Sequence, residues 1–328
     1  MKKSILLLTV MLLATMMLSA CGEKQDETIS VAGLKGPTTM GMVKMLSDDA
    51  ALGEEAKYDF LLAGSADEIT PGLLRGEIDL AAIPSNLASV LYNQSQGEIQ
   101  VLAVNTLGVV YIMTNERLNG EPISVTDLKG KTIYATGKGS APEYYLDNIL
   151  TSYGLEMDKD VYMDWRSEPT EIVSLMQTAA DNHETIYVMI PQPFTTAALN
   201  QVTGFNIVLD LTNEWIIAEK GNSPVTGVLV GNKEFVEDNE EAVAEFLKAY
   251  EESINYVNSH EAEAAALIEE YGIVKAAIAE TAIPYCNLTY LDGAKMKVVL
   301  SKFYEVLLKT NESSVGGAVP GDDFYYEP

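Results

Sequence analysis

The stretch IDLAAIPSN, residues 78–86, decides the fold. Its apolar run Ile78–Ile83 has the length of a buried strand, and it leads through Pro84 into Ser85–Tyr92, where apolar residues recur at helical spacing. A short strand that opens directly into an amphipathic helix is typical of parallel sheets, because parallel neighbours need a crossover connection. The stretch therefore predicts an α/β fold.

The same alternation extends outward on both sides of this stretch. Before and after it we expect strands at Thr28–Leu34, Tyr58–Leu62, Ile99–Val104 and Val109–Met113, with helices at Thr39–Leu46 and Ala66–Leu74. A second run follows, with strands at Thr132–Ala135, Val161–Asp164, Ile186–Ile190 and Phe205–Leu209, and helices at Pro142–Tyr153 and Thr170–Ala180. One more strand is expected at Val225–Val230. The chain thus contains two α/β units, each built on a mostly parallel sheet flanked by helices.

Two polar breaks separate these units. Asn115–Gly130 carries Gly120, Pro122 and Gly130, and a second break, EKGNSP, covers residues 219–224. We expect the chain to cross between the units at both places, with hinges at 115–131 and 220–226. The predicted organisation is lobe I at 28–114 plus 225–328, and lobe II at 115–224.

The N-terminus predicts export. Lys2 and Lys3 precede an apolar run, Ile5–Leu18, that is too short to span a bilayer comfortably. The run ends in LSAC, residues 18–21, which resembles the lipobox of bacterial lipoproteins. We expect a signal peptide at 1–20, lipidation of Cys21, a tether at 21–27, and a body anchored to the outer face of the cytoplasmic membrane. The alternative is a plain secretory signal with an incidental Cys21.

Composition excludes several classes of function. The chain has 328 residues, 48 acidic against 21 basic, and a net charge of −27, which disfavours binding to nucleic acid. Only two histidines, His183 and His260, and two cysteines, Cys21 and Cys286, are present, so a metal cage, a disulfide framework and a cofactor are not expected. No nucleophile or paired-carboxylate motif is found, which argues against an enzyme. We expect Cys286 to be a buried hydrophobic residue.

Candidate ligand contacts lie where strands lead into helices. Helix N-termini at the carboxyl ends of parallel strands offer free N–H groups, and ligands of open sheets bind there. Each of these turns also has a purely structural interpretation as an ordinary turn or N-cap. The candidates are Lys35, Gly36, Thr38, Thr39, Ser65, Ser85, Asn86, Lys138, Gly139 and Ser140, with Phe194, Tyr111 and Tyr144 as a candidate aromatic wall.

Several motifs resemble one family, the solute-binding lipoproteins of ABC importers. These are the lipobox, KGPTTM at 35–40 and IDLAAIPSN at 78–86. DLKGKTI at 127–133, followed by GKGSAPE at 137–143, is similar to the opening of the second domain in binding proteins for sulfonates, taurine, nitrate and thiamine precursors. PQPF at 191–194 occupies the matching later position. The chain departs from these relatives at Gln192, where they often carry an acidic residue.

The resemblance implies a type II periplasmic-binding-protein fold of two lobes, with a small solute held between them. It implies a monomer that delivers its solute to an ABC permease, and it adds Gln192 and Phe194 to the ligand contacts. The solute is a sulfonate, a carboxylate or a pyrimidine-like heterocycle. Two alternatives stay open: an enzyme of the menaquinone-pathway type on the same fold, although those enzymes lack a lipobox, and a lipoprotein that senses a solute.

Overall fold

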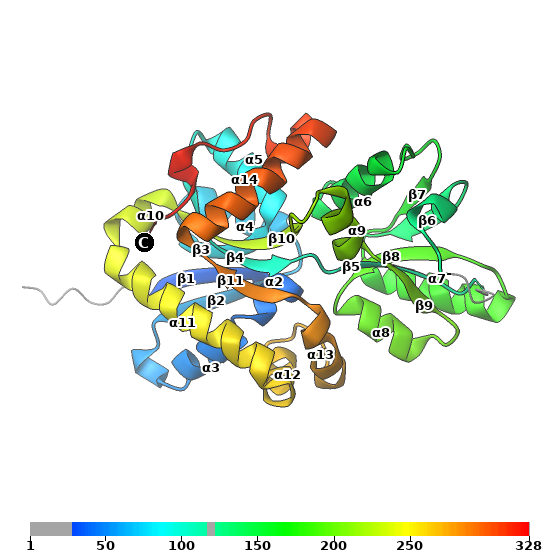
Figure 1. The fold of residues 1–328 in the computed structure, drawn as a ribbon. Coiled ribbons are helices and arrows are strands. Elements are labelled where there is room, and N and C mark those ends of the chain that lie inside the picture. Colours follow the sequence, from blue (N-terminus) through cyan, green and yellow to red (C-terminus); the bar gives the residue numbers. More distant parts are fainter. Residues whose placement is uncertain (1–27, 117–121, 328) are drawn as a thin grey trace, which may run out of the picture.

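The computed structural model describes residues 28–116 and 122–327. It contains two sheets, each flanked by helices and separated along the long axis of the molecule (Figure 1). The expected signal peptide, Cys21 and the tether lie outside the described residues.

The first lobe is built on a six-stranded sheet with the order β11-β4-β10-β3-β1-β2. Its strands are β1 (Ile29–Leu34), β2 (Tyr58–Ala63), β3 (Leu80–Pro84), β4 (Ile99–Leu107), β10 (Val225–Asn232) and β11 (Leu288–Leu291). Strand β1 pairs in parallel with β2 and β3, whereas β10 pairs antiparallel with β3 and β4, and β11 antiparallel with β4. Four of the six strands therefore run in one direction, so the sheet is mixed.

Helices cover both faces of this sheet. One face carries α4 (Ala66–Leu74), α5 (Ser85–Ser95) and α14 (Gly293–Thr310), whose apolar residues join one core cluster. The other face carries α2 (Pro37–Met40), α3 (Val43–Ala50), α10 (Lys233–Asp238), α11 (Glu240–Ser259), α12 (Glu261–Glu270) and α13 (Ala276–Ala282), over a second cluster. The single helix expected at Thr39–Leu46 is thus divided into α2 and α3.

The second lobe contains a five-stranded sheet with the order β7-β6-β8-β5-β9. Its strands are β5 (Val110–Thr114), β6 (Thr132–Ala135), β7 (Tyr162–Trp165), β8 (Tyr187–Pro191) and β9 (Asn206–Asp210). Its helices are α6 (Ala141–Ser152), α7 (Pro169–Asn182), α8 (Phe194–Gln201) and α9 (Leu211–Ala218). Only β5 runs against the other strands, because it pairs antiparallel with both β8 and β9.

The chain crosses from the first lobe to the second earlier than the sequence suggested. Strand β5 lies inside the second sheet, so the crossing is the short connection between Leu107 and Val110 rather than the polar stretch after residue 114. That polar stretch joins β5 to β6 within the second lobe, and its residues 117–121 lie outside the described part. The return crossing lies between Ala218 and Val225.

The C-terminal segment packs against the first lobe. Phe324 and Tyr325 are buried, and the backbone N–H of Tyr326 donates to the carbonyl of Val101 on β4 at 2.9 Å. Asp323 accepts a hydrogen bond from Tyr92 and pairs with Lys233 at 3.1 Å. These two contacts lower the pKa of Asp323, the Tyr92 hydroxyl being the larger cause. The aromatic C-terminal end therefore packs onto the first lobe.

Replacement of Asp323 by asparagine should lower the melting temperature at pH 7 and have little effect in acid. A carboxyl whose folded pKa is lowered stabilises the fold above its unfolded pKa of about 3.9, and this stabilisation is lost as the pH falls through the folded value. The side chain is 58% exposed, so the effect at pH 7 should be at most about 1 kcal/mol. Thermal unfolding at pH 7 and pH 3 measures it, with Asp322→Asn, at 92% exposure, as control. An offset that persists unchanged at pH 3 would contradict this account.

Candidate functional site

The carboxyl ends of strands from both lobes meet where the lobes face each other. Strands β1 and β3 end at Leu34 and Pro84, and β6 and β8 end at Ala135 and Pro191. The N-termini of α2, α5, α6 and α8 follow directly, and a contact of Asn86 with Gly139 brings the α5 and α6 turns together across the two lobes. Figure 1 shows these helices in their two lobes. This is the placement that parallel strands dictate for ligand sites.

The α2 turn is packed against two glycines. A Cβ atom on Gly227 would lie 2.4 Å from Cγ2 of Thr38 and 2.5 Å from Oδ1 of Asn105, and one on Gly33 would lie 2.3 Å from Oγ1 of Thr39. Thr39 is fully buried, and its hydroxyl donates to the carbonyl of Leu34 at 2.6 Å. Thr39 therefore fixes the turn, and glycine is needed on the sheet beneath because any side chain would displace it.

Thr38 is also buried and lies beside Asn105 of β4. The amide nitrogen of Asn105 donates to the carbonyl of Thr38 at 3.2 Å, while its buried amide oxygen has no hydrogen-bond partner. Lys35 is exposed at the start of the turn. Sequence analysis missed Asn105, although a polar residue near the carboxyl end of an apolar strand is the signal that would have found it.

Ser85 and Asn86 begin α5 and behave differently. Ser85 is fully buried, and its hydroxyl donates to the carbonyl of Val225, where the return crossing enters β10. Asn86 is only 4% exposed, and its amide nitrogen donates across to the carbonyl of Gly139 in the second lobe at 3.5 Å. The amide oxygen of Asn86 has no hydrogen-bond partner. Asn86 is thus the candidate residue that links the two lobes.

Two of the predicted N-termini are occupied by carboxylates of their own helices. Glu68 accepts from the backbone N–H groups of Gly64 and Ser65 at 3.1 and 3.0 Å, which completes a capping box for α4. In the second lobe, Glu143 accepts from the N–H of Gly139, and the hydroxyl of Ser140 donates to the carbonyl of Gly137. An incoming anion would compete with these carboxylates for the same donors.

At α8 the amide of Gln192 is oriented by its neighbour. Its oxygen accepts from the backbone N–H and the hydroxyl of Thr196, at 3.2 and 2.9 Å, and Gln192 is buried. Its amide nitrogen is therefore the group left for a further contact. Phe194 is partly buried and packs against the second lobe's own core, which supports the structural interpretation of this residue.

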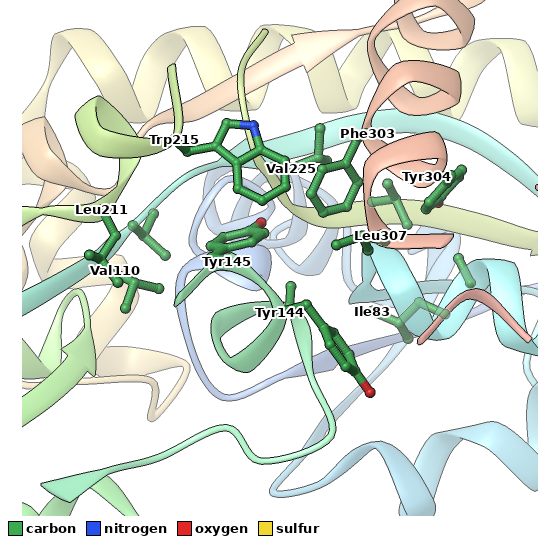
Figure 2. Packing of buried hydrophobic residues seen from close by; sticks show 14 of the residues in the cluster. Ile83, Val110, Tyr144, Tyr145, Leu211, Trp215, Val225, Phe303, Tyr304 and Leu307 are labelled. Atoms are coloured by element: carbon green, nitrogen blue, oxygen red, sulfur yellow. The ribbon is translucent and has the colours of Figure 1, made fainter. Parts of the chain in front are cut away.

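The predicted aromatic wall is divided between two places. Tyr111 is buried on β5, and its hydroxyl donates to the carbonyl of Tyr285 in the first lobe at 3.4 Å. Burial raises the pKa of Tyr111, so its hydroxyl stays protonated and can donate. Tyr144 instead lies beside the aromatic cluster described next, and Figure 2 shows its ring directed away from Trp215.

An aromatic cluster joins the two lobes behind these contacts. The ring of Trp215 on α9 lies 5.3 Å from that of Tyr145 on α6 and 5.6 Å from that of Phe303 on α14 of the first lobe (Figure 2). All three side chains are buried, and the Tyr145 hydroxyl lies 3.3 Å from that of Thr226 at the return crossing. One apolar core therefore continues from the first lobe into the second.

Two exposed lysines lie near the candidate site, whereas the cavities described below lie in the first lobe. Lys35 and Lys138 are exposed, one in each lobe, and no ion pair formed by the described residues includes either of them. Three cavities of about 520, 490 and 380 Å³ are lined by first-lobe residues only. The lobes themselves meet through direct contacts, Asn86 with Gly139 and Tyr111 with Tyr285.

Two further features of the described residues bear on function. Over residues 28–116 and 122–327, His, Cys, Asp and Glu form no group of three or more that could hold a metal ion. Within the same ranges, no helix combines the length and the apolar character that a bilayer crossing requires. Cys286 is fully buried, with Sγ 3.9 Å from Sδ of Met40, and burial raises the pKa of its thiol, as expected for a hydrophobic packing residue.

Comparison with known proteins identifies a family model and several solved structures that are similar to this chain. Residues 117–264 match the family model described as NMT1/THI5 like. A search of curated proteins by sequence finds no match. Among solved structures, an ABC transporter structure from Parabacteroides distasonis is similar, with a TM-score of 0.74, 21% identity, and coverage of 92% of this chain and 99% of that one.

Two further structures are binding proteins. The periplasmic aliphatic sulphonate binding protein SsuA from Escherichia coli has a TM-score of 0.71 at 18% identity, covering 92% of each chain. The periplasmic nitrate-binding protein NrtA from Synechocystis has a TM-score of 0.57 at 12% identity, covering 92% of this chain and 91% of that one. The fold expected from the sequence is confirmed: the chain has the two-lobe, type II periplasmic-binding-protein fold that these structures share.

Proposed function

We propose that this protein is an exported lipoprotein that captures a small polar solute between its lobes and delivers it to an ABC importer. The observation that carries this proposal is the link from Asn86, at the N-terminus of α5, to Gly139 of the other lobe. Both partners lie at the carboxyl ends of strands, the position where ligands of such sheets bind. The fold agrees with that of the sulphonate-binding and nitrate-binding proteins. The signal-like N-terminus and Cys21 support export and anchoring.

Capture requires the lobes to separate and close. The connections at 107–110 and 218–225 are the two places where the chain passes between the lobes. A solute that contacts both lobes stabilises the closed form by its differential affinity for that form. Asn86 and Tyr111 each donate a hydrogen bond to the opposite lobe. These two hydrogen bonds should therefore form when the lobes close and break when they separate. The closed form is then the species that the permease receives.

The pattern of unpaired groups favours a neutral solute that carries hydrogen-bond donors. The buried amide oxygen of Asn86 lacks a donor, and an unsatisfied buried acceptor is costly. Sulfonate, carboxylate and nitrate supply acceptors only, and the helix N-termini at Ser65 and Gly139 already hold carboxylates. Of the three expected classes, the pyrimidine-like heterocycle fits best, since ring nitrogens and amino groups provide both donors and acceptors. Lys35 and Lys138 are the features that favour an anion.

No observation favours catalysis. His183 and His260 are both exposed, and the ring of His260 stacks on that of Tyr256 at 4.3 Å.

The two-lobe geometry would also serve a lipoprotein that senses its solute, because import and sensing both begin with capture of the solute by closure of the lobes. A pull-down of the permease from membranes, with and without solute, separates import from sensing.

Thermal unfolding of the purified chain against a solute panel tests the proposal. The panel contains amino-substituted pyrimidines, sulfonates, carboxylates and nitrate. A true solute at 100 times its dissociation constant stabilises the native state by about 2.7 kcal/mol, which raises the melting temperature by several degrees. A shift confined to the heterocycles supports the proposed class, and a shift with sulfonates alone would replace it. Absence of any shift after carried-over solute has been removed would count against capture.

Variants of Asn86 should separate donor-bearing solutes from anions. For a neutral donor-bearing solute, Asn86→Leu should weaken binding about tenfold or more, whereas Asn86→Asp keeps an acceptor and should cost less. For an anionic solute, Asn86→Asp should be the more harmful change because it adds a like charge. Isothermal titration calorimetry of each variant, with whichever panel solute binds the unchanged protein, measures the dissociation constants that distinguish a neutral solute from an anionic one. Asn255→Leu, an exposed change on α11, is the matched control, and equal loss in all three variants would remove Asn86 from the site.

A further inference from the structure

We propose that the outward face of α14 binds the headgroups of anionic phospholipids. This face, here called the basic stripe, consists of Lys295, Val298, Lys302 and Lys309. The proposal rests on the export and lipid anchoring proposed above, and it adds an orientation for the anchored body.

The geometry of α14 aligns these residues. Lys295, Lys302 and Lys309 are spaced seven residues apart, and seven residues of an α-helix make almost two turns, so the three side chains share one face at intervals of about 10 Å. All three lysines are exposed, and Val298 between the first two is 55% exposed. The opposite face, with Phe303 and other large apolar side chains, is buried in the first lobe. Figure 1 shows α14 on the outside of that lobe.

The charge of this helix is opposite to that of the chain. α14 carries four lysines and one glutamate, a net charge of +3, in a chain whose net charge is −27. Lys297 is paired with Asp322 and Glu327, whereas no ion pair among the described residues includes a stripe lysine. Glu305 lies beside the stripe and leaves its outward face with a net charge of +2.

The side-chain types favour lipid over a protein partner. Protein interfaces are enriched in tyrosine, tryptophan and arginine and depleted in lysine, and the stripe has lysine and valine only. Lysines flanking a small apolar side chain suit the boundary of an anionic bilayer, where the ammonium groups meet headgroups. The tether of residues 21–27 would keep the body within about 25 Å of the bilayer. An anionic surface repels the acidic faces of this body, so the stripe is the face that can approach it.

Lysine labelling of the membrane-bound chain tests this inference. The full chain, produced in a bacterium so that it carries whatever anchor the cell attaches, is mixed with vesicles of phosphatidylcholine alone or of equal parts phosphatidylcholine and phosphatidylglycerol. A membrane-impermeant amine acylation reagent is then applied, and labelling is quantified by mass spectrometry. We expect Lys295, Lys302 and Lys309 to be protected about threefold or more on the anionic vesicles only, and the protection to vanish at about 0.5 M salt.

The control lysines are Lys57, Lys248 and Lys275, all exposed. Lys248 lies on α11 and Lys275 directly before α13, two helices that pack over the other face of the first sheet, and Lys57 directly precedes β2. Conversion of the three stripe lysines to glutamine should reduce flotation with anionic vesicles, and the same change at the control lysines should not. Equal protection of both sets, or none, overturns the proposal. Protection on native membranes but not on anionic vesicles would assign the stripe to a protein partner instead.

Failure of the anchor is distinguishable from failure of the stripe. A chain that does not float with phosphatidylcholine vesicles carries no lipid at Cys21. If it also fails to float with the anionic vesicles, the stripe proposal falls as well. If it floats with the anionic vesicles alone, the stripe binds lipid by charge and the proposal stands. Solute binding is measured separately by thermal unfolding, so neither result depends on the captured solute.

Discussion

Replacement of Trp215 by alanine should destabilise the protein by about 3–5 kcal/mol, the range typical of removing a large buried aromatic side chain. Trp215 is fully buried between Tyr145 of its own lobe and Phe303 of the other, with ring centroids within 5.6 Å of both. The surrounding residues come from α6, α9 and α14, and α9 leads directly into the return crossing (Figure 2). A cavity here would therefore weaken the core and the joint between the lobes together.

Denaturant unfolding measures this effect, and a double-mutant cycle with Phe303→Ala isolates the part that acts between lobes. Because the two rings are in contact, the combined loss should be smaller than the sum of the single losses by about 0.5–1.5 kcal/mol. Trp165→Ala on β7 is the control, since Trp165 is only partly buried. Additive losses, or a Trp215→Ala loss no larger than that of the control, would mean that the cluster does not couple the lobes.

The spacing of apolar residues along the sequence was sufficient to predict most helices and strands. Thr132–Ala135 and Ala66–Leu74 were expected with the bounds that the structure gives them. The reason is that these runs have one buried face or are wholly apolar, so periodicity alone identifies them. β11, Leu288–Leu291, was missed because four residues with one buried position carry too little pattern.

Lobe membership could not be predicted from the same signals. The apolar run of β5 fits either sheet, and its position between β8 and β9 depends on partners 73 to 81 and 92 to 99 residues later in the chain. The glycine-rich and polar stretch after it has the composition of a linker between lobes, yet the strands before and after it, β5 and β6, belong to the same second sheet. A polar, glycine-rich composition predicts that a segment lies at the surface. It does not predict which of the two sheets the next strand joins.

The sequence located the helix N-termini that make up the candidate site, but it did not reveal the hydrogen bonds that these N-termini make. Ser65 and Ser140 were expected to face a ligand, and in both cases a glutamate three residues later holds the neighbouring backbone N–H. The Ser-x-x-Glu spacing was legible in the sequence as a capping pattern. Asn105 and Trp215 depended on tertiary contacts with Thr38 and Phe303, which no local pattern reveals.

Replacement of Gly227 by alanine should disrupt the α2 turn and the proposed solute site in one step. The added Cβ would lie 2.4 Å from Cγ2 of Thr38 and 2.5 Å from Oδ1 of Asn105, distances that force both groups to move. Overpacking of this kind costs about 1–3 kcal/mol. Since Thr38 and Asn105 lie at the expected ligand position, solute affinity should fall about tenfold or more even where the variant remains folded at 25 °C.

The second change Thr38→Ser makes the test specific to this contact. Serine lacks the Cγ2 atom that meets the new methyl group, so the double variant should recover part of the lost stability in thermal unfolding. It should recover less of the affinity, because the clash with Oδ1 of Asn105 remains. Glycine is therefore required at 227 by the side chains of Thr38 and Asn105 rather than by its own conformation. Gly227→Ala with unchanged stability and unchanged affinity would show that α2 moves freely and that the solute lies elsewhere.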